Sequence, residues 1–156
     1  MERGLLSVGH RPEKETLMNP QEIELVKSSF AKVAPIADAA AVIFYDELFE
    51  RDPKLRSLFA EDMTEQRRKL MMMLGTAVNG LDDWGTVAGH VSALGERHVS
   101  YGVTSEDYDT VGAALIETLS KGLGDEFTPD VREAWIACYT VVSGAMLDAA
   151  ESASVA

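Results

Sequence analysis

The chain has 156 residues, of which 46% are hydrophobic and 26% charged, the balance of one ordinary globular domain. Its net charge of −12 argues against nucleic acid or an anionic membrane as the main partner. The single cysteine, Cys138, excludes an internal disulfide framework and a CxxC redox pair. The N-terminal residues contain no apolar signal core, so we expect a cytoplasmic protein.

Residues 1–18 contain glycines, a proline and several charges without a sustained period, and we expect them to form a flexible extension. Helical signals begin at Asn19, which supplies an N-cap, followed by a proline and, three residues after the cap, a glutamate. Apolar residues then recur at helical spacing from Ile23 to Val33, and Pro35 is expected to open a second helix.

The rest of the chain repeats this pattern of start signal and apolar stripe. We expect a short turn at Asp52 and Pro53, followed by a helix that is capped by Thr64 and reaches Leu81. A further helix passes through Val91 and His98 and stops near Gly102, and the last two helices start at Thr104 and Thr128. No stretch alternates convincingly with period two. We therefore predict an all-α fold of about six to eight helices over residues 19–151, followed by a tail at 152–156.

Four polar side chains lie on or beside the expected apolar faces: Tyr45, Gln66, His98 and Tyr108. A buried polar group without a partner costs about 1–3 kcal/mol, so these are either four separately satisfied core residues or parts of one site. His98 is either a core histidine bonded to a backbone carbonyl or a neutral imidazole that ligates a metal or a haem iron.

Other motifs favour no competing chemistry. None of the three histidines follows a glutamate by three residues, as a di-iron helical bundle requires. The chain has no GxGxxG, Walker or GxSxG motif. Methionines 71–73 are interpreted as flexible core filler, and Cys138 as a small buried apolar residue.

The order of residues resembles the globin family over residues 19–150. The segments that carry the resemblance are 42–49 (VIFYDELF), 52–53 (DP), 58–59 (LF), 66–70 (QRRKL), 94–98 (LGERH), 101–103 (YGV), 108–112 (YDTVG), 127–129 (FTP) and 134–135 (AW). They are similar to bacterial single-domain globins, to the haem domain of flavohaemoglobins and to the neuroglobin-like group. The resemblance implies a globin fold that binds haem b noncovalently.

The resemblance also implies a role for each matching residue. His98 is the expected proximal ligand to iron, and Phe59 the ring that packs against the haem face. The other implied contacts are Tyr45, Gln66 and Leu70 on the distal wall, Val103 at the haem edge, Lys69 near a propionate, and Tyr108 near the proximal histidine. A glutamate of the last helix in flavohaemoglobin-type domains falls near Ala150 here, with Asp148 and Glu151 beside it and no clean match.

With one imidazole on the iron, the sixth position stays open for O2, CO or NO, although Tyr45 could approach ferric iron. A tyrosine hydroxyl and a glutamine amide can both donate hydrogen bonds to bound O2, which predicts high O2 affinity. The leading function is therefore reversible O2 binding. The alternatives are NO dioxygenation with a separate reductase, gas sensing through a partner, and a helical regulatory domain without haem; monomer and homodimer both remain open.

Overall fold

The structure, a computed structural model, describes residues 18–100 and 104–155. Six α-helices and four short 3₁₀ helices make up these ranges, which contain no strand. In chain order they are α2 (Pro20–Val33), η2 (Ala34–Ile36), α3 (Ala37–Arg51), η3 (Pro53–Leu58), α4 (Thr64–Asn79), η4 (Leu81–Asp83), α5 (Trp84–Ser100), α6 (Ser105–Leu123), η5 (Gly124–Glu126) and α7 (Pro129–Val155). The predicted all-α fold is confirmed.

Helix starts follow the predicted caps at four positions. Asp52 accepts from the Lys54 N–H and Thr128 from the Val131 N–H, each at 3.2 Å, and the other two caps are reciprocal. The Asn19 side chain accepts a hydrogen bond from the Glu22 N–H at 2.8 Å, and the Glu22 carboxylate accepts one from the Asn19 N–H at 3.1 Å. Thr104 and Asp107 form the same reciprocal pair at the start of α6. Each pair satisfies backbone donors that the first turn of a helix leaves free.

Three boundaries differ from the prediction. Thr64 does not cap α4: it is the first helical residue, and Asp62 accepts a hydrogen bond from its backbone N–H at 3.0 Å, because an aspartate two residues upstream can form the turn that starts a helix. Leu81 lies in η4, after α4 has ended at Asn79. Pro35 lies in η2, and α3 begins at Ala37. Residues 1–17 and the expected stop at Gly102 lie outside the described residues.

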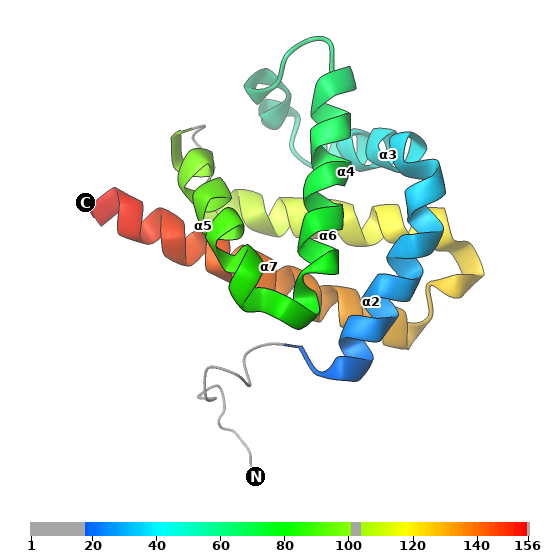
Figure 1. Cartoon of the computed structure of the whole chain (residues 1–156). Coiled ribbons are helices and arrows are strands. Elements are labelled where there is room, and N and C mark those ends of the chain that lie inside the picture. Colours follow the sequence, from blue (N-terminus) through cyan, green and yellow to red (C-terminus); the bar gives the residue numbers. More distant parts are fainter. Residues whose placement is uncertain (1–17, 101–103, 156) are drawn as a thin grey trace.

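The helices pack around two groups of buried side chains. In Figure 1, α6 and α7 run across the molecule and α4 crosses them. The larger cluster joins α2, α3, α4, α6 and the first half of α7, and Trp135 lies fully buried within it. The smaller cluster is built around Val91 of α5, Tyr108 of α6 and Met146 of α7. Helix α5 packs mainly on α7 and has little contact with α4, which precedes it in the chain.

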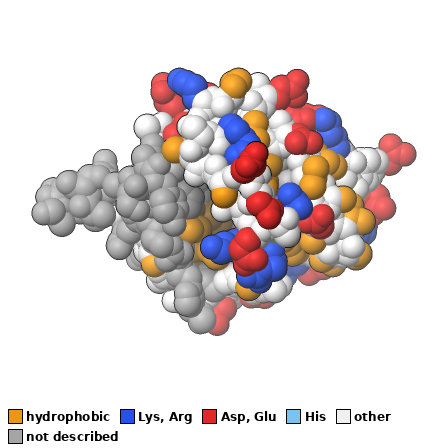
Figure 2. All heavy atoms as spheres, turned by 90° about the horizontal axis from the view of Figure 1, so that it is seen from above, with side chains coloured by type: hydrophobic (Ala, Val, Ile, Leu, Met, Phe, Trp, Pro, Cys, Tyr) orange, Lys and Arg blue, Asp and Glu red, His pale blue; other side chains and the backbone are white. Residues whose placement is uncertain are grey.

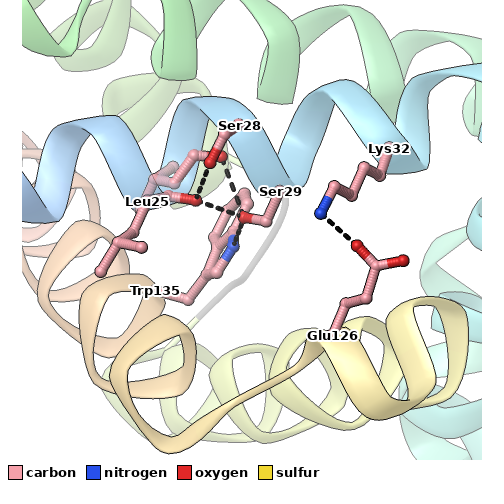
Figure 3. Close-up of polar contacts among 7 residues, drawn as sticks. Leu25, Ser28, Ser29, Lys32, Glu126 and Trp135 are labelled. Atoms are coloured by element: carbon pink, nitrogen blue, oxygen red, sulfur yellow. Dashed lines mark hydrogen bonds and ion pairs between the residues drawn. The ribbon is translucent and has the colours of Figure 1, made fainter.

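A buried hydrogen-bond chain joins α2 to α7 (Figure 3). The indole Nε1–H of Trp135 donates to the Ser29 hydroxyl at 2.8 Å, and that hydroxyl donates to the Leu25 carbonyl at 2.7 Å. Lys32 and Glu126 form an ion pair at the same junction. Trp135 can therefore be buried completely without leaving its polar atom unsatisfied.

One stretch of the described residues, Pro20–Arg51, contains an 18-residue window that is apolar enough by composition to cross a membrane, with a mean hydropathy of 1.2 in that window. It consists of two helices, α2 and α3, separated by η2. Val26, Val33 and Phe44 of this stretch belong to the larger cluster, so its apolar face forms the protein core.

Candidate functional site

Tyr45 of α3 and Gln66 of α4 meet although they are 21 residues apart. The Gln66 side-chain amide Nε2–H donates to the Tyr45 hydroxyl oxygen at 3.0 Å. Tyr45 is buried, with 6% of its surface exposed, and Gln66 is half-buried. Because the hydroxyl oxygen accepts this bond, its own proton remains free to be donated. The pair thus presents hydrogen-bond donors and no charge.

Burial raises the pKa of the Tyr45 hydroxyl above its ordinary value of 10.0, and the hydrogen bond from Gln66 opposes that shift. Desolvation is the larger influence, because it disfavours the phenolate. Tyr45 therefore stays a neutral phenol, the form that can donate a hydrogen bond, at neutral pH.

Three aromatic rings surround the ring of Tyr45 and limit its motion. Phe44 lies at 5.0 Å from the Tyr45 ring centroid, and Phe59 at 5.5 Å, both edge to face. Phe49 lies 5.9 Å from Tyr45 and 5.5 Å from Phe59. Edge-to-face ring pairs of this kind contribute about 0.5–1.5 kcal/mol each beyond the burial of their area. The cluster holds Phe59, the predicted haem-packing ring, against the predicted distal tyrosine.

The predicted proximal residues lie at the end of α5 and beyond. His98 belongs to the α5 backbone, but the side chains of residues 96–100, and Val103 altogether, lie outside the described residues. The described part of α5 approaches α7 closely at Gly95, where an added Cβ would lie 2.7 Å from the Met146 Cα and also meet its carbonyl oxygen. Only glycine permits this approach, and it occurs one helical turn before His98.

Tyr108 is buried in the smaller cluster with Val91 and Met146. Its backbone carbonyl accepts a hydrogen bond from the Tyr139 hydroxyl at 2.5 Å, which ties α6 to α7. The Tyr139 ring lies against Gly112, where an added Cβ would be 2.8 Å from Cε2. Burial raises the pKa of both tyrosine hydroxyls. Tyr108 thus shares a cluster with α5, as its predicted place near the proximal histidine requires.

The remaining predicted residues differ in their surroundings. Leu70 is half-buried against the larger cluster, and the Lys69 side chain is exposed. Asp148, one of the carboxylates considered on the last helix, is exposed, and the side chains of Ala150 and Glu151 lie outside the described residues. Burial raises the pKa of the Cys138 thiol to about 12, so this cysteine is an inert core residue, as interpreted from the sequence.

Residues of this region that sequence patterns did not single out are Phe49, Arg56, Gly95 and Tyr139. Tyr139 acts through a contact with Tyr108, 31 residues away, whereas Phe49 acts through ring contacts with the nearby residues Tyr45 and Phe59. Gly95 does carry a sequence signal, because a glycine inside a helical stripe often marks a close packing contact.

The arrangement fits the haem that the resemblance implies. The helix with the predicted proximal histidine, α5, packs on α7, while the helix with Gln66, α4, packs on α3 and α2. Helix α4 therefore packs in the larger cluster and α5 in the smaller one, and the two helices have little direct contact. Uncharged donors and aromatic rings on the α4 side are chemically suited to a planar apolar group with a small polar ligand.

Comparison with known proteins identifies the family. The globin family profile matches residues 42–146 of the chain. A neuroglobin of Dissostichus mawsoni is 27% identical over 143 residues, covering 83% of this chain and 90% of that protein. A flavohemoprotein of Bacillus subtilis is 29% identical over 136 residues, covering 84% of this chain but 34% of that protein. A bacterial globin structure from Campylobacter jejuni has the same fold, with a TM-score of 0.78 at 20% identity, covering 86% of this chain and 97% of that one. This chain belongs to the globin family.

Proposed function

We propose that this globin binds haem b noncovalently through His98 and binds O2 reversibly, with Tyr45 and Gln66 as hydrogen-bond donors to the ligand. Family membership implies a haem and a diatomic gas as ligand. The observation that carries the more specific proposal is the 3.0 Å hydrogen bond from Gln66 to Tyr45 inside the aromatic cluster. It aligns two neutral donors at the position that the family resemblance assigns to the distal wall.

A haem held there supplies a ferrous iron whose sixth position is open to a diatomic gas. The chain contributes the surroundings of that position. The Tyr45 proton is free to be donated because Gln66 occupies a lone pair of the same oxygen. The rings of Phe44, Phe49 and Phe59 exclude water, which strengthens each hydrogen bond to a partly charged ligand atom. O2 attracts more negative charge than CO does, so these donors favour O2.

The visible absorption spectrum of the purified protein tests this proposal. It is recorded in the ferric state, after dithionite reduction, in air and under CO. The expected result is a Soret band with five-coordinate ferrous character and a stable oxygenated form. Gln66 is a poor iron ligand, so a bis-imidazole ferrous spectrum would contradict the proposal. The His98→Ala variant should lose this spectrum, and a variant that keeps it would show that another residue ligates the iron.

NO dioxygenation is a second candidate, favoured by the similarity to the Bacillus subtilis flavohemoprotein. In this reaction NO, O2 and one electron give nitrate, so turnover requires a reductase. The match covers 34% of that protein, and we propose a flavin reductase as the electron donor. Adding NO to the oxygenated protein distinguishes the two functions. Stoichiometric nitrate, with repeated turnover when a flavin reductase and NADH are added, supports the dioxygenase; slow exchange of gases without nitrate supports an O2-binding role alone.

A further inference from the structure

We propose that Arg56 is a positioning residue that holds residues 59–61, and with them the Phe59 ring, in place for haem binding. The inference rests on the proposed function, because Phe59 matters in this way only if a haem lies beside it. Arg56 belongs to η3 (Pro53–Leu58), the short helix between α3 and the segment that leads to α4. The hydrogen bonds of its guanidinium go to backbone carbonyls and not to Tyr45 or Gln66.

The Arg56 guanidinium donates hydrogen bonds to three successive backbone carbonyls. Its Nη1 donates to the Phe59 carbonyl at 3.2 Å and to the Ala60 carbonyl at 3.0 Å. Its Nη2 donates to the Glu61 carbonyl at 3.1 Å. These carbonyls follow the end of η3 and precede α4, so helical bonding does not hold them. The Arg56 side chain therefore supplies hydrogen-bond donors to three carbonyls that helical backbone bonding does not satisfy.

The backbone reinforces this closure at its first residue. The Phe59 N–H donates to the Arg56 carbonyl at 3.2 Å, and the Arg56 side chain donates to the Phe59 carbonyl. Residues 56 and 59 are thus bonded in both directions. Such reciprocal bonding fixes both the position and the direction in which the Phe59 backbone leaves η3.

The guanidinium also lies over an aromatic ring. Its central carbon is 5.4 Å from the centroid of Phe49, and the Phe49 ring is 5.5 Å from the Phe59 ring. Arg56 therefore supports Phe59 twice, through the Phe59 carbonyl and through the neighbouring ring. A cation over an aromatic face contributes about 0.5–1 kcal/mol at an exposed site. A planar fork that donates to several carbonyls while its charge lies over an aromatic ring is specific to arginine, and lysine cannot replace it.

The support that Arg56 gives to Phe59 also affects Tyr45, one of the two proposed donors to the bound gas. The Phe59 ring packs edge to face on Tyr45 at 5.5 Å, so a displaced Phe59 loosens the ring that carries the distal hydroxyl. We expect loss of the Arg56 fork to release residues 59–61, shift the Phe59 ring relative to the haem and speed haem loss. Global stability should change less, because Arg56 is half-buried and lies outside both clusters of buried side chains.

The test compares Arg56→Ala, Arg56→Lys and the control Lys54→Ala in the full chain. Lys54 lies on the same η3 and has an exposed side chain. Its variant therefore also removes one positive charge but leaves the hydrogen bonds of Arg56 in place. Hydrogen–deuterium exchange of the peptide covering residues 59–63 is measured in the haem-free and haem-loaded proteins. Haem loss is followed by transfer to an excess of an acceptor apoglobin. The ¹H shifts of the Phe59 ring in the CO form report its position against the porphyrin ring current.

Both Arg56 variants should increase exchange at residues 59–63 by about tenfold or more in both states, since a loss of about 1.4 kcal/mol of local stability corresponds to that factor. They should also speed haem loss severalfold and move the Phe59 ring shifts, while Lys54→Ala matches the wild type. Unchanged exchange would overturn the proposal. Faster exchange with unchanged haem loss and ring shifts would overturn its link to the haem.

Rescue by Arg56→Lys would also overturn it, because charge alone would then suffice. If the wild-type chain takes up no haem, the proposed function fails and the haem half of this inference fails with it. Exchange in the haem-free protein still decides, in that case, whether Arg56 holds residues 59–61.

Discussion

Single residues decide which atoms of this globin can donate a hydrogen bond inside it. Tyr45 accepts from Gln66 and keeps its proton, while Ser29 both accepts from Trp135 and donates to Leu25. In each case a polar atom on an otherwise apolar helix face is satisfied by a residue from another helix. Removing one partner leaves the other buried and unpaired, which costs more than the hydrogen bond itself contributes.

Tyr45→Phe should raise the O2 dissociation rate about tenfold, since one lost hydrogen bond of about 1–1.5 kcal/mol corresponds to that factor. The aromatic contacts with Phe44 and Phe59 remain in this variant, which removes the hydroxyl donor and with it the acceptor of the Gln66 amide. The rate is measured by mixing the oxygenated protein with excess CO. Because Tyr45 stays neutral, the wild-type rate should be nearly constant from pH 6 to 9, values well below its raised pKa. A rate that barely changes in the variant would remove Tyr45 from the distal site.

Ser29→Ala should destabilise the fold by about 1–3 kcal/mol, because it leaves the buried Trp135 indole N–H without its acceptor. Ser28→Ala is the matched control. Ser28 lies on the same helix, is exposed and donates to the same Leu25 carbonyl at 3.4 Å. It should change stability by less than about 0.5 kcal/mol. Urea unfolding followed by circular dichroism measures both, and equal effects would show that the indole bond contributes nothing specific.

Whole helices are positioned by where their backbones approach one another. Helix α5 meets α7 at Gly95 and Met146 without an intervening side chain. Helix α6 meets α7 where Tyr139 lies against Gly112 and bonds to the Tyr108 carbonyl. Both contacts lie beside the smaller cluster of Val91, Tyr108 and Met146. The close contact with α7 therefore sets the position of α5, the helix that carries His98.

Gly95→Ala and Gly89→Ala should have opposite effects on stability. Both add a methyl group to α5, and alanine favours a helix over glycine by about 1 kcal/mol. An added Cβ at Gly89 meets nothing within 4 Å, so this variant should be stabilised. At Gly95 the Cβ meets the Met146 backbone, which cannot rotate away, so we expect destabilisation of about 1–3 kcal/mol. Urea unfolding measures both; stabilisation by Gly95→Ala would show that α5 can move away freely.

At the scale of the whole molecule, the charged side chains among the described residues lie at the surface, and the buried titratable groups among them are phenols and a thiol. On the face shown in Figure 2, basic side chains lie among acidic ones without a single-sign patch. Ion pairs such as Lys27–Asp82 and Arg67–Asp38 are partly exposed and stabilise little individually. Stability at high pH depends instead on the buried phenols and the buried thiol.

The free energy of unfolding should fall as the pH rises above about 9. Burial raises the pKa of the Cys138 thiol from its ordinary value of 9.0 to about 12, and it also raises the pKa of Tyr45, Tyr108 and Tyr139 above 10.0. The unfolded chain therefore binds fewer protons in this range, which lowers stability with pH. Urea unfolding at pH 8, 9, 10 and 11 measures the slope. Cys138→Ala should flatten it between pH 9 and 10, and an identical slope would contradict the prediction.

Much of the fold could be predicted because its signals are local. Asn19 with Glu22 and Thr104 with Asp107 bond within one turn, and the stripes that bury Val26, Phe44 and Trp135 follow from the helical period. The wrong boundaries at Thr64 and Leu81 arose where several polar or apolar residues compete for one turn. The polar exceptions on these stripes singled out Tyr45, Gln66, His98 and Tyr108 as either separately satisfied core residues or parts of one site. The structure joins Gln66 to Tyr45 and buries Tyr108 in the smaller cluster.

The sequence by itself determined the helices, their order and the family, because caps, periodicity and ordered motifs depend on residues that are close along the chain. Only the tertiary structure decided that Gln66 donates to Tyr45, that Arg56 closes residues 59–61 over the Phe49 ring, and that Gly95 brings α5 onto α7. These contacts depend on the distances between helices and on side-chain rotamers. Both are set by how the whole core packs, which no local pattern encodes.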